Sequence, residues 1–178
     1  MVIQHALSLA EYLALPEEKP YREFMHGIAV QKPMTNNDHG DLVSVILYAL
    51  MSYARDRGGK AGPEVSVLLG TPPDQRVLLP DVAFWAAGLR QERYPTNPPT
   101  LAVEVRSPSQ SLAEQREKCR YYCANGVAVA WLVDPARQTV EVFEGMGELS
   151  WTVGDLQTAA LPGFELTVAE VFEAMARD

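Results

Sequence analysis

The sequence has 178 residues, of which 47% are hydrophobic and 21% are charged, as in one ordinary globular domain. Its net charge of −8 excludes a chain that binds nucleic acid through general attraction to phosphate. No apolar run approaches the roughly 20 residues that cross a bilayer, and the N-terminal segment does not resemble a signal peptide. We therefore expect one cytoplasmic domain over residues 1–178 and no membrane partner. Cys119 and Cys123 lack the spacing of a structural zinc site, so we interpret them as small buried side chains.

The N-terminal half of the sequence predicts two helices separated by a hairpin. Ser8 is a capping residue for a short helix that ends before Pro16. Residues 21–33 are typical of two short strands around Gly27. Residues 36–59 begin with polar capping residues, carry apolar residues at helical spacing and end in two glycines, which makes this the clearest helix of the sequence.

The C-terminal half alternates between strands and helices. Short β-branched segments predict strands, and two amphipathic segments predict helices, the second of them capped by Thr167. The predicted strands are 64–70, 76–85, 100–107, 127–134 and 139–145, and the predicted helices are 111–126 and 167–178. This order predicts a mixed α/β (α+β) domain with one central sheet flanked by helices.

Two acidic residues, Asp81 and Glu104, interrupt segments that otherwise read as buried strands. Strand alternation places Ala83 on the face of Asp81, and it places Ala102 and Arg106 on the face of Glu104. Burying an unpaired carboxylate costs several kcal/mol, and a hard cation bound between small neighbours would remove that cost. In the alternative, Asp81 forms an internal ion pair with Arg106, and Glu104 lies at the sheet edge.

Seven segments, taken in their order and spacing, resemble the bacterial Uma-two family. They are "SLAEYLALPEE", "REFMHGIAV", "LPDVAFW", "LAVEVRSPSQS", "EKCRYYCANGVAVAWLVDP", "TVEVF" and "LPGFELTVAEVF". The family is placed among the restriction-endonuclease-like folds, the PD-(D/E)xK nucleases. The resemblance implies a single restriction-endonuclease-like domain over residues 1–178, with a central mixed β-sheet flanked by helices and a metal-dependent phosphodiesterase site.

The resemblance also implies which residues bind metal. Asp81 matches the Asp of the PD motif and Glu104 the acid of (D/E)xK, so both are expected to hold Mg²⁺ or Mn²⁺, helped by a backbone carbonyl near Val105. Glu23 matches a glutamate that many members carry on the early hairpin, and is expected to be a third acidic ligand. The implied reaction is in-line attack of a water, activated by the ion, on a phosphodiester bond.

The basic residue of the motif differs from the nuclease pattern. Arg106 stands in place of the lysine, and because it stays charged it can stabilise a transition state but cannot readily transfer a proton. By resemblance, Lys118 on the following helix is the substitute, since it lies on a stripe beside the core-facing stripe of that helix. The alternative is an ordinary solvated lysine.

Three further residues are candidates for substrate binding. His39, at the start of the long helix, matches a position where the family often has histidine, and a phosphate near a helix N-terminus is reasonable; a solvated histidine near the helix cap is the alternative. Ser107 and Gln110 lie in the turn after Glu104 and are expected to contact substrate or metal water. A helix cap at Ser109 or Ser111 would explain much of the same turn.

Three functions follow from this reading. We expect a Mg²⁺- or Mn²⁺-dependent nuclease whose substrate is nucleic acid, with DNA favoured over RNA. We expect it to be a homodimer, by analogy with nucleases that cut both strands of a duplex. The alternatives are a non-catalytic nuclease-fold protein that binds nucleic acid or a protein partner, and a domain whose strand acids form structural ion pairs. To offset the acidic net charge, a local basic patch is expected from the side chains of Arg116, Lys118 and Arg120, with Arg55 and Arg57 nearby.

Overall fold

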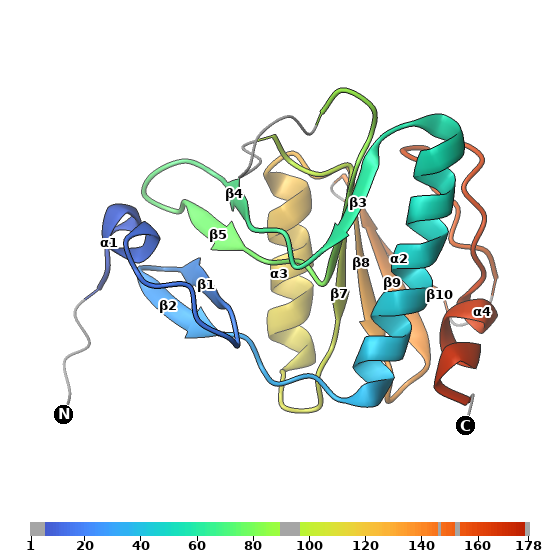
Figure 1. The fold of residues 1–178 in the computed structure, drawn as a ribbon, viewed down its shortest axis with the longest axis horizontal. Helices are drawn as coiled ribbons and strands as arrows, with labels where there is room; N and C mark the ends of the chain where they lie inside the picture. Colours follow the sequence, from blue (N-terminus) through green and yellow to red (C-terminus); the bar gives the residue numbers. More distant parts are fainter. Residues whose placement is uncertain (1–5, 90–96, 146, 152–153, 177–178) are drawn as a thin grey trace.

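The computed structural model describes residues 6–89, 97–145, 147–151 and 154–176, and contains two β-sheets packed with helices (Figure 1). The helices are α1 (Leu9–Leu13), α2 (Asn37–Arg57), α3 (Leu112–Ala124), α4 (Val168–Glu173) and a 3₁₀ turn, η1 (Ala174–Ala176). The strands are β1 (Arg22–Met25), β2 (Ile28–Gln31), β3 (Lys60–Pro63), β4 (Val67–Leu69), β5 (Arg76–Leu78), β6 (Val82–Trp85), β7 (Leu101–Val105), β8 (Val129–Asp134), β9 (Thr139–Glu144) and β10 (Gly147–Trp151). This is the mixed α/β architecture expected from the sequence.

The larger sheet has six strands in the order β10-β9-β8-β7-β6-β3. Strands β7 and β8 run parallel, and α3 lies between them in the chain, since parallel neighbours need a long crossover. The pairs β6–β7 and β8–β9 on either side are antiparallel. The predicted mixed sheet is therefore present.

Helices α2 and α3 cover opposite faces of the larger sheet (Figure 1). One core lies between α2 and the larger sheet. It contains Leu42, Ile46 and Leu50, which helical spacing places on one face of α2, and the strand residues whose side chains point toward that helix. Cys119 of α3 belongs to the second core, which lies on the other face with the small residues of β6 and β7. Cys119 is buried, Cys123 is partly buried and both are free thiols, as expected of packing residues.

The smaller sheet, with the strand order β2-β1-β5-β4, corrects the expectation of one central sheet. Residues 76–85 were predicted as a single strand, but β5 belongs to the smaller sheet and β6 to the larger one. Pro80 lies between them, and because proline has no N–H it cannot continue a central strand ladder. The chain therefore passes from one sheet to the other at Leu79–Asp81, which places Asp81 at the junction.

The hairpin of β1 and β2 forms as predicted around Gly27. His26 and Gly27 have φ values of 52° and 75°, the left-handed conformation that both central residues of the favoured two-residue hairpin turn require. The hairpin packs antiparallel against β5 through the pair Phe24 and Val77. It thereby brings Glu23 and the residue that follows β2, Lys32, toward the junction of the two sheets.

The ends of the helices follow the capping signals of the sequence. Ser8 and Thr167 each form a capping box, with Glu11 and Glu170 respectively. The last α-helix is shorter than predicted, because α4 ends at Glu173 and continues as the 3₁₀ turn η1. Strands β3 and β10, both at edges of the larger sheet, were not predicted.

Candidate active site

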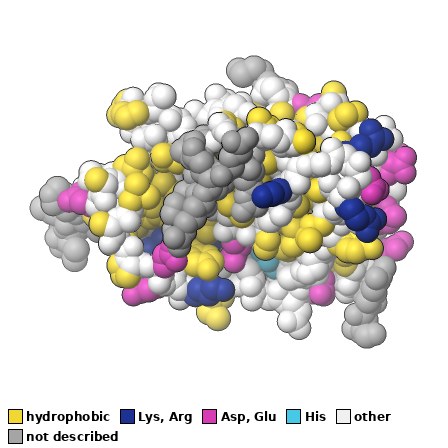
Figure 2. Space-filling model, turned by 45° about the horizontal axis from the view of Figure 1, so that its top comes forward, with side chains coloured by type: hydrophobic (Ala, Val, Ile, Leu, Met, Phe, Trp, Pro, Cys, Tyr) yellow, Lys and Arg dark blue, Asp and Glu magenta, His cyan; other side chains and the backbone are white. Residues whose placement is uncertain are grey.

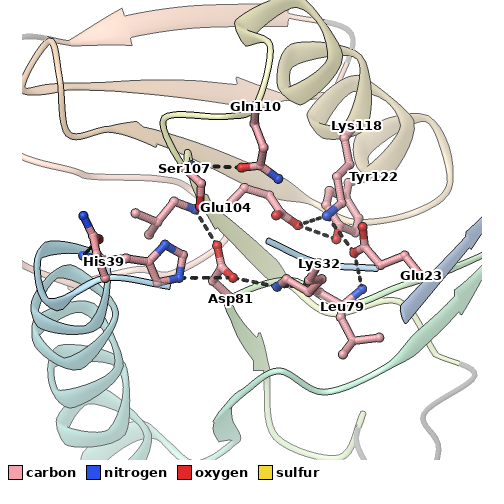
Figure 3. Close-up of polar contacts among 12 residues, drawn as sticks. Glu23, Lys32, His39, Leu79, Asp81, Glu104, Ser107, Gln110, Lys118 and Tyr122 are labelled. Carbon is pink, nitrogen blue, oxygen red and sulfur yellow. Dashed lines mark hydrogen bonds and ion pairs between the residues drawn. The ribbon is translucent and has the colours of Figure 1, made fainter. Parts of the chain in front are cut away.

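Asp81 and Glu104 face each other where the two sheets meet (Figure 3). The register of β6 and β7 pairs Val82 with Val103 and Ala83 with Ala102. Extending this register by one residue places Asp81 opposite Glu104, on the same face and with Cβ atoms about 5 Å apart. Both carboxylates are buried, with Asp81 4% and Glu104 2% exposed.

Both oxygens of Asp81 are engaged. Oδ1 accepts a hydrogen bond from Lys32 Nζ at 2.6 Å and lies 3.5 Å from His39 Nε2, while Oδ2 accepts from the N–H of Val105 at 2.7 Å. Burial raises the pKa of Asp81, but the contact with His39 and the charge of Lys32 outweigh burial and hold the pKa well below its usual range. Asp81 is therefore an ionised carboxylate at neutral pH.

Glu104 has a different electrostatic environment. Its Oε1 accepts a hydrogen bond from the Tyr122 hydroxyl at 2.7 Å and lies 2.9 Å from Lys118 Nζ. Burial raises the pKa of Glu104 to about 7; Lys118 acts in the opposite direction and the negative charge of Asp81 adds to the rise. The two facing carboxyls thus differ in proton affinity.

Lys118 reaches the acids from α3, as expected, and is not the solvated lysine of the alternative. Its side chain is 5% exposed, and its Nζ donates to Glu23 Oε1 at 2.7 Å as well as approaching Glu104. Burial lowers the pKa of Lys118, but the charges of Glu104 and Glu23 outweigh it and raise the pKa above its ordinary value. Lys118 is therefore a fixed positive charge in the site.

Glu23 ties the hairpin to the junction of the sheets. The same Oε1 that accepts from Lys118 also accepts the N–H of Leu79 at 2.7 Å. Glu23 thus holds both Lys118 and the chain segment that leads to Asp81. Its role as a metal ligand stays a prediction.

Two residues of this cluster, Lys32 and Tyr122, were missed in the sequence. Lys32 Nζ donates to Leu79 O at 2.8 Å and to Asp81; burial lowers its pKa, but the charges of Asp81 and Glu104 raise it above the ordinary value. A signal was available, because Glu23 pairs with Val30 across the hairpin and alternation then places the side chain of residue 32 on the same face. Tyr122 was placed on the apolar stripe of its helix and on the stripe beside it that carries Lys118, but its hydroxyl was given no role, although a buried tyrosine hydroxyl usually needs a partner.

Arg106 pairs with Asp134 and not with Asp81, so the alternative of an Asp81–Arg106 ion pair is wrong. The Arg106 guanidinium lies 2.9 Å from Asp134 Oδ1 and donates to the Gln110 carbonyl at 3.1 Å. The reason is the parallel register, which pairs Val105 with Val133 and so brings the next residues, Arg106 and Asp134, together. A direct role of Arg106 on the substrate stays a prediction.

The three predicted substrate-binding residues lie at the rim of the cluster. His39 is 8% exposed, and its Nδ1 is buried without a hydrogen-bond partner in the described part of the chain. The Ser107 N–H donates to Gln110 Oε1 at 2.9 Å, so these two residues stabilise the turn after β7. Ser111 occupies the N-cap position of α3 but makes no side-chain capping bond. Substrate contacts of His39, Ser107 and Gln110 stay predictions.

The donor atoms at the junction suit a hard divalent cation held by two carboxylates. Within the described ranges, no group of three His, Cys, Asp or Glu side chains is close enough to hold a metal ion, so the predicted set of Asp81, Glu104, Val105 and Glu23 is not assembled as a cage. Magnesium, however, is usually bound by one or two carboxylates together with water and substrate phosphate. The facing pair of Asp81 and Glu104 fits that kind of site.

The predicted basic patch lacks two of the side chains expected from α3. Arg116 forms a two-bond ion pair with Glu141, and Lys118 is buried in the site. On the face drawn in Figure 2, Lys and Arg side chains stand apart from one another among apolar and acidic ones.

None of the helices in the described ranges has the length and apolar character that crossing a membrane requires.

Comparisons with known proteins show the family and the fold of the chain. The family model Uma2 (Uma-two), described as "Putative restriction endonuclease", matches residues 9–169. A crystal structure described as "a putative nuclease belonging to DUF820 from Anabaena variabilis" superposes with a TM-score of 0.84 at 23% sequence identity, covering 95% of this chain and 99% of that one. At this identity the likeness shows the fold. The comparison with curated proteins gave no match.

Proposed function

Because the chain belongs to the Uma2 family, we propose that it is a nuclease that hydrolyses phosphodiester bonds of nucleic acid, with a divalent cation as cofactor and DNA as substrate. The observation that carries this proposal is the buried pair of Asp81 and Glu104 with the Lys118 ammonium 2.9 Å from Glu104. Two carboxylates and one fixed positive charge at a strand junction are what a phosphodiesterase needs, since its chemistry depends on positioning and charge.

Asp81 and Glu104 would hold Mg²⁺ or Mn²⁺. When bound, the ion would supply positive charge against the phosphate and lower the pKa of the attacking water. Tyr122 would orient Glu104 through its hydrogen bond of 2.7 Å, and the Val105 N–H would orient Asp81. Both carboxyl groups are thus held by neighbours that do not depend on the ion.

Lys118 would act as an electrostatic group rather than as a base. Its raised pKa keeps the ammonium protonated at neutral pH, so it cannot accept a proton from water. The positive charge of the Lys118 ammonium, held beside Glu104, would instead stabilise the negative charge that develops on the phosphate oxygens in the transition state. Glu23 would keep Lys118 in place, through the bond of 2.7 Å.

The test is cleavage of plasmid DNA, linear DNA and RNA with Mg²⁺ and with Mn²⁺. We expect Lys118→Met to lower the rate about 10²–10³-fold, whereas Lys60→Met, the same change at an exposed position of β3, leaves it unchanged. Melting curves of both variants show whether the fold is kept. A folded Lys118→Met protein that cleaves at the wild-type rate would remove Lys118 from the reaction.

One observation favours the second candidate, a non-catalytic nuclease-fold protein that binds nucleic acid or a protein. Asp81 and Glu104 are already paired with Lys32 and Lys118, so each of the two acids has a positive partner without a metal. Absence of cleavage across all substrates, with Mn²⁺ present, would favour this candidate.

We further propose that the protein acts as a homodimer in the cytoplasm. A dimer would place two sites on the two strands of a duplex. Sedimentation at micromolar concentration should give twice the chain mass of 19.6 kDa, and a monomer under these conditions would refute the proposal.

A further inference from the structure

Lys32 places a positive charge in a cradle of oxygen atoms at the junction. Its Nζ donates to Asp81 Oδ1 at 2.6 Å and to the carbonyl oxygen of Leu79 at 2.8 Å. The side chain is 9% exposed, so this contact is sheltered from water. A carboxylate oxygen together with a main-chain carbonyl is also the kind of ligand set that hard divalent cations take. The ammonium therefore occupies a position suited to a metal ion.

The two oxygens of Asp81 differ in how many donors surround them. Oδ2 accepts the N–H of Val105 at 2.7 Å, and His39 Nε2 approaches Oδ1 at 3.5 Å beside the ammonium. A cation that binds Oδ1 at about 2 Å must therefore share that oxygen with Lys32 or replace it, and a cation that binds the second lone pair of Oδ2 shares the same carboxylate with the ammonium. Two positive charges on one carboxylate repel each other strongly in a buried site.

The charge of the cluster leads to the same result. Three acids, Glu23, Asp81 and Glu104, face the two ammonium groups of Lys32 and Lys118, so the cluster carries at most one net negative charge. A divalent cation added to all five side chains would therefore leave net positive charge in the buried junction. Withdrawal of Lys32 removes one of those positive charges, which burial favours.

We propose that the Lys32 ammonium is a tethered competitor of the divalent cation, which binds Asp81 by displacing it. The proposal rests on the proposed function, because it assumes that Asp81 is a metal ligand. The main chain need not move, since the Lys32 N–H is held by Tyr21 O at 2.8 Å and the four-carbon stem is flexible. In the absence of metal, the Lys32 ammonium thus occupies Asp81. The metal affinity of the site is therefore lower than that of the same carboxylates without Lys32.

The test measures Mn²⁺ binding by titration calorimetry, without substrate. Lys32→Gln removes the charge but keeps an amide that can donate to Leu79 O, and Lys60→Gln makes the same change in net charge at an exposed site. If Lys32 occupies Asp81 nine-tenths of the time, removing it lowers the dissociation constant about tenfold. We expect a decrease of at least about tenfold for Lys32→Gln and no change for Lys60→Gln.

A second measurement uses the wild-type chain and so does not depend on how the variant folds. Acylation of lysines, followed by mass spectrometry, should modify Lys32 slowly in the absence of metal. Saturating Mn²⁺ should raise the rate at Lys32, which leaves its cradle, and not at Lys118, which stays on Glu23. Protection of Lys32 that is equal with and without bound Mn²⁺ would overturn the inference.

The outcomes separate this inference from the proposed function. Equal Mn²⁺ affinity of wild type and Lys32→Gln overturns the competition and leaves the metal site intact. No Mn²⁺ binding by either protein overturns both. Tighter binding by Lys32→Gln without cleavage of any nucleic acid supports the competition and contradicts the nuclease.

Discussion

Replacing Glu104 by glutamine should change the pH dependence of stability in a defined direction. Burial raises the pKa of Glu104 to about 7 from the ordinary 4.5, so the folded protein favours the protonated carboxyl. The stabilisation that this gives is fully present below pH 4.5 and is lost as the pH rises through 7. Glutamine resembles the protonated carboxyl and has no proton to lose.

The size of the effect follows from the same two pKa values. Each pKa unit corresponds to about 1.4 kcal/mol, so the wild type should lose about 3 kcal/mol relative to Glu104→Gln between pH 4.5 and pH 8. Lys118 titrates far above this range, and the contribution of Asp81, whose pKa is lowered, is lost at acid pH in both proteins. The glutamine carbonyl still accepts from Tyr122, so the difference reports the charge.

Urea unfolding of both proteins at several pH values measures this difference directly. The free energy of unfolding of Glu104→Gln minus that of the wild type should rise steadily with pH across this range. A difference that stays constant within about 0.5 kcal/mol, the usual error of additivity, would refute the raised pKa. A difference that falls with pH would show that Glu104 and Lys118 form a structural ion pair.

Three further predictions follow from contacts of the site. Tyr122→Phe leaves the buried Glu104 Oε1 without its hydroxyl donor and should lower the free energy of unfolding by about 1–3 kcal/mol; unchanged stability in urea would contradict that hydrogen bond. Arg106→Met leaves Asp134, which is 2% exposed, with only the Ala136 N–H at 3.2 Å and the exposed Arg137 at 3.8 Å. Breaking this buried pair should cost up to about 3–5 kcal/mol while calorimetry shows unchanged Mn²⁺ affinity; weaker Mn²⁺ binding would instead place Arg106 in the site. Mn²⁺ should raise the melting temperature of the wild type and not of Asp81→Ala, and equal shifts in the two proteins would exclude Asp81 as a ligand.

The sequence predicts well those elements whose signals are local. Helix α2 is predicted by the apolar spacing of Leu42, Ile46 and Leu50, and α1 and α4 by their capping serine and threonine. These signals come from residues that are close together in the chain. Strand β3, Lys60–Pro63, contains glycine and proline and no β-branched residue, and it forms because an edge position tolerates such residues. The strand is determined by its pairing with β6, so local propensity does not predict it.

The candidate site, too, was predicted from the sequence only in part. Alternation predicted the face of each acid on its own strand, and the family resemblance implied that Asp81 and Glu104 share one site. The antiparallel register of β6 and β7 brings them together. Lys32 was missed because its contact with Asp81 depends on how the hairpin packs at the junction of the two sheets. The partner of Arg106 was also missed, since it is set by the parallel register with Asp134 across the crossover.

The central claim is that Asp81 and Glu104 together hold a divalent cation, and a crystal soaked in Mn²⁺ tests it most directly. Anomalous scattering should show an ion about 2 Å from an oxygen of each carboxylate, with Lys32 Nζ moved away from Asp81. Lys118 should remain on Glu23. A map without an ion between the two carboxylates, at a concentration of Mn²⁺ that saturates the protein in solution, would contradict the claim.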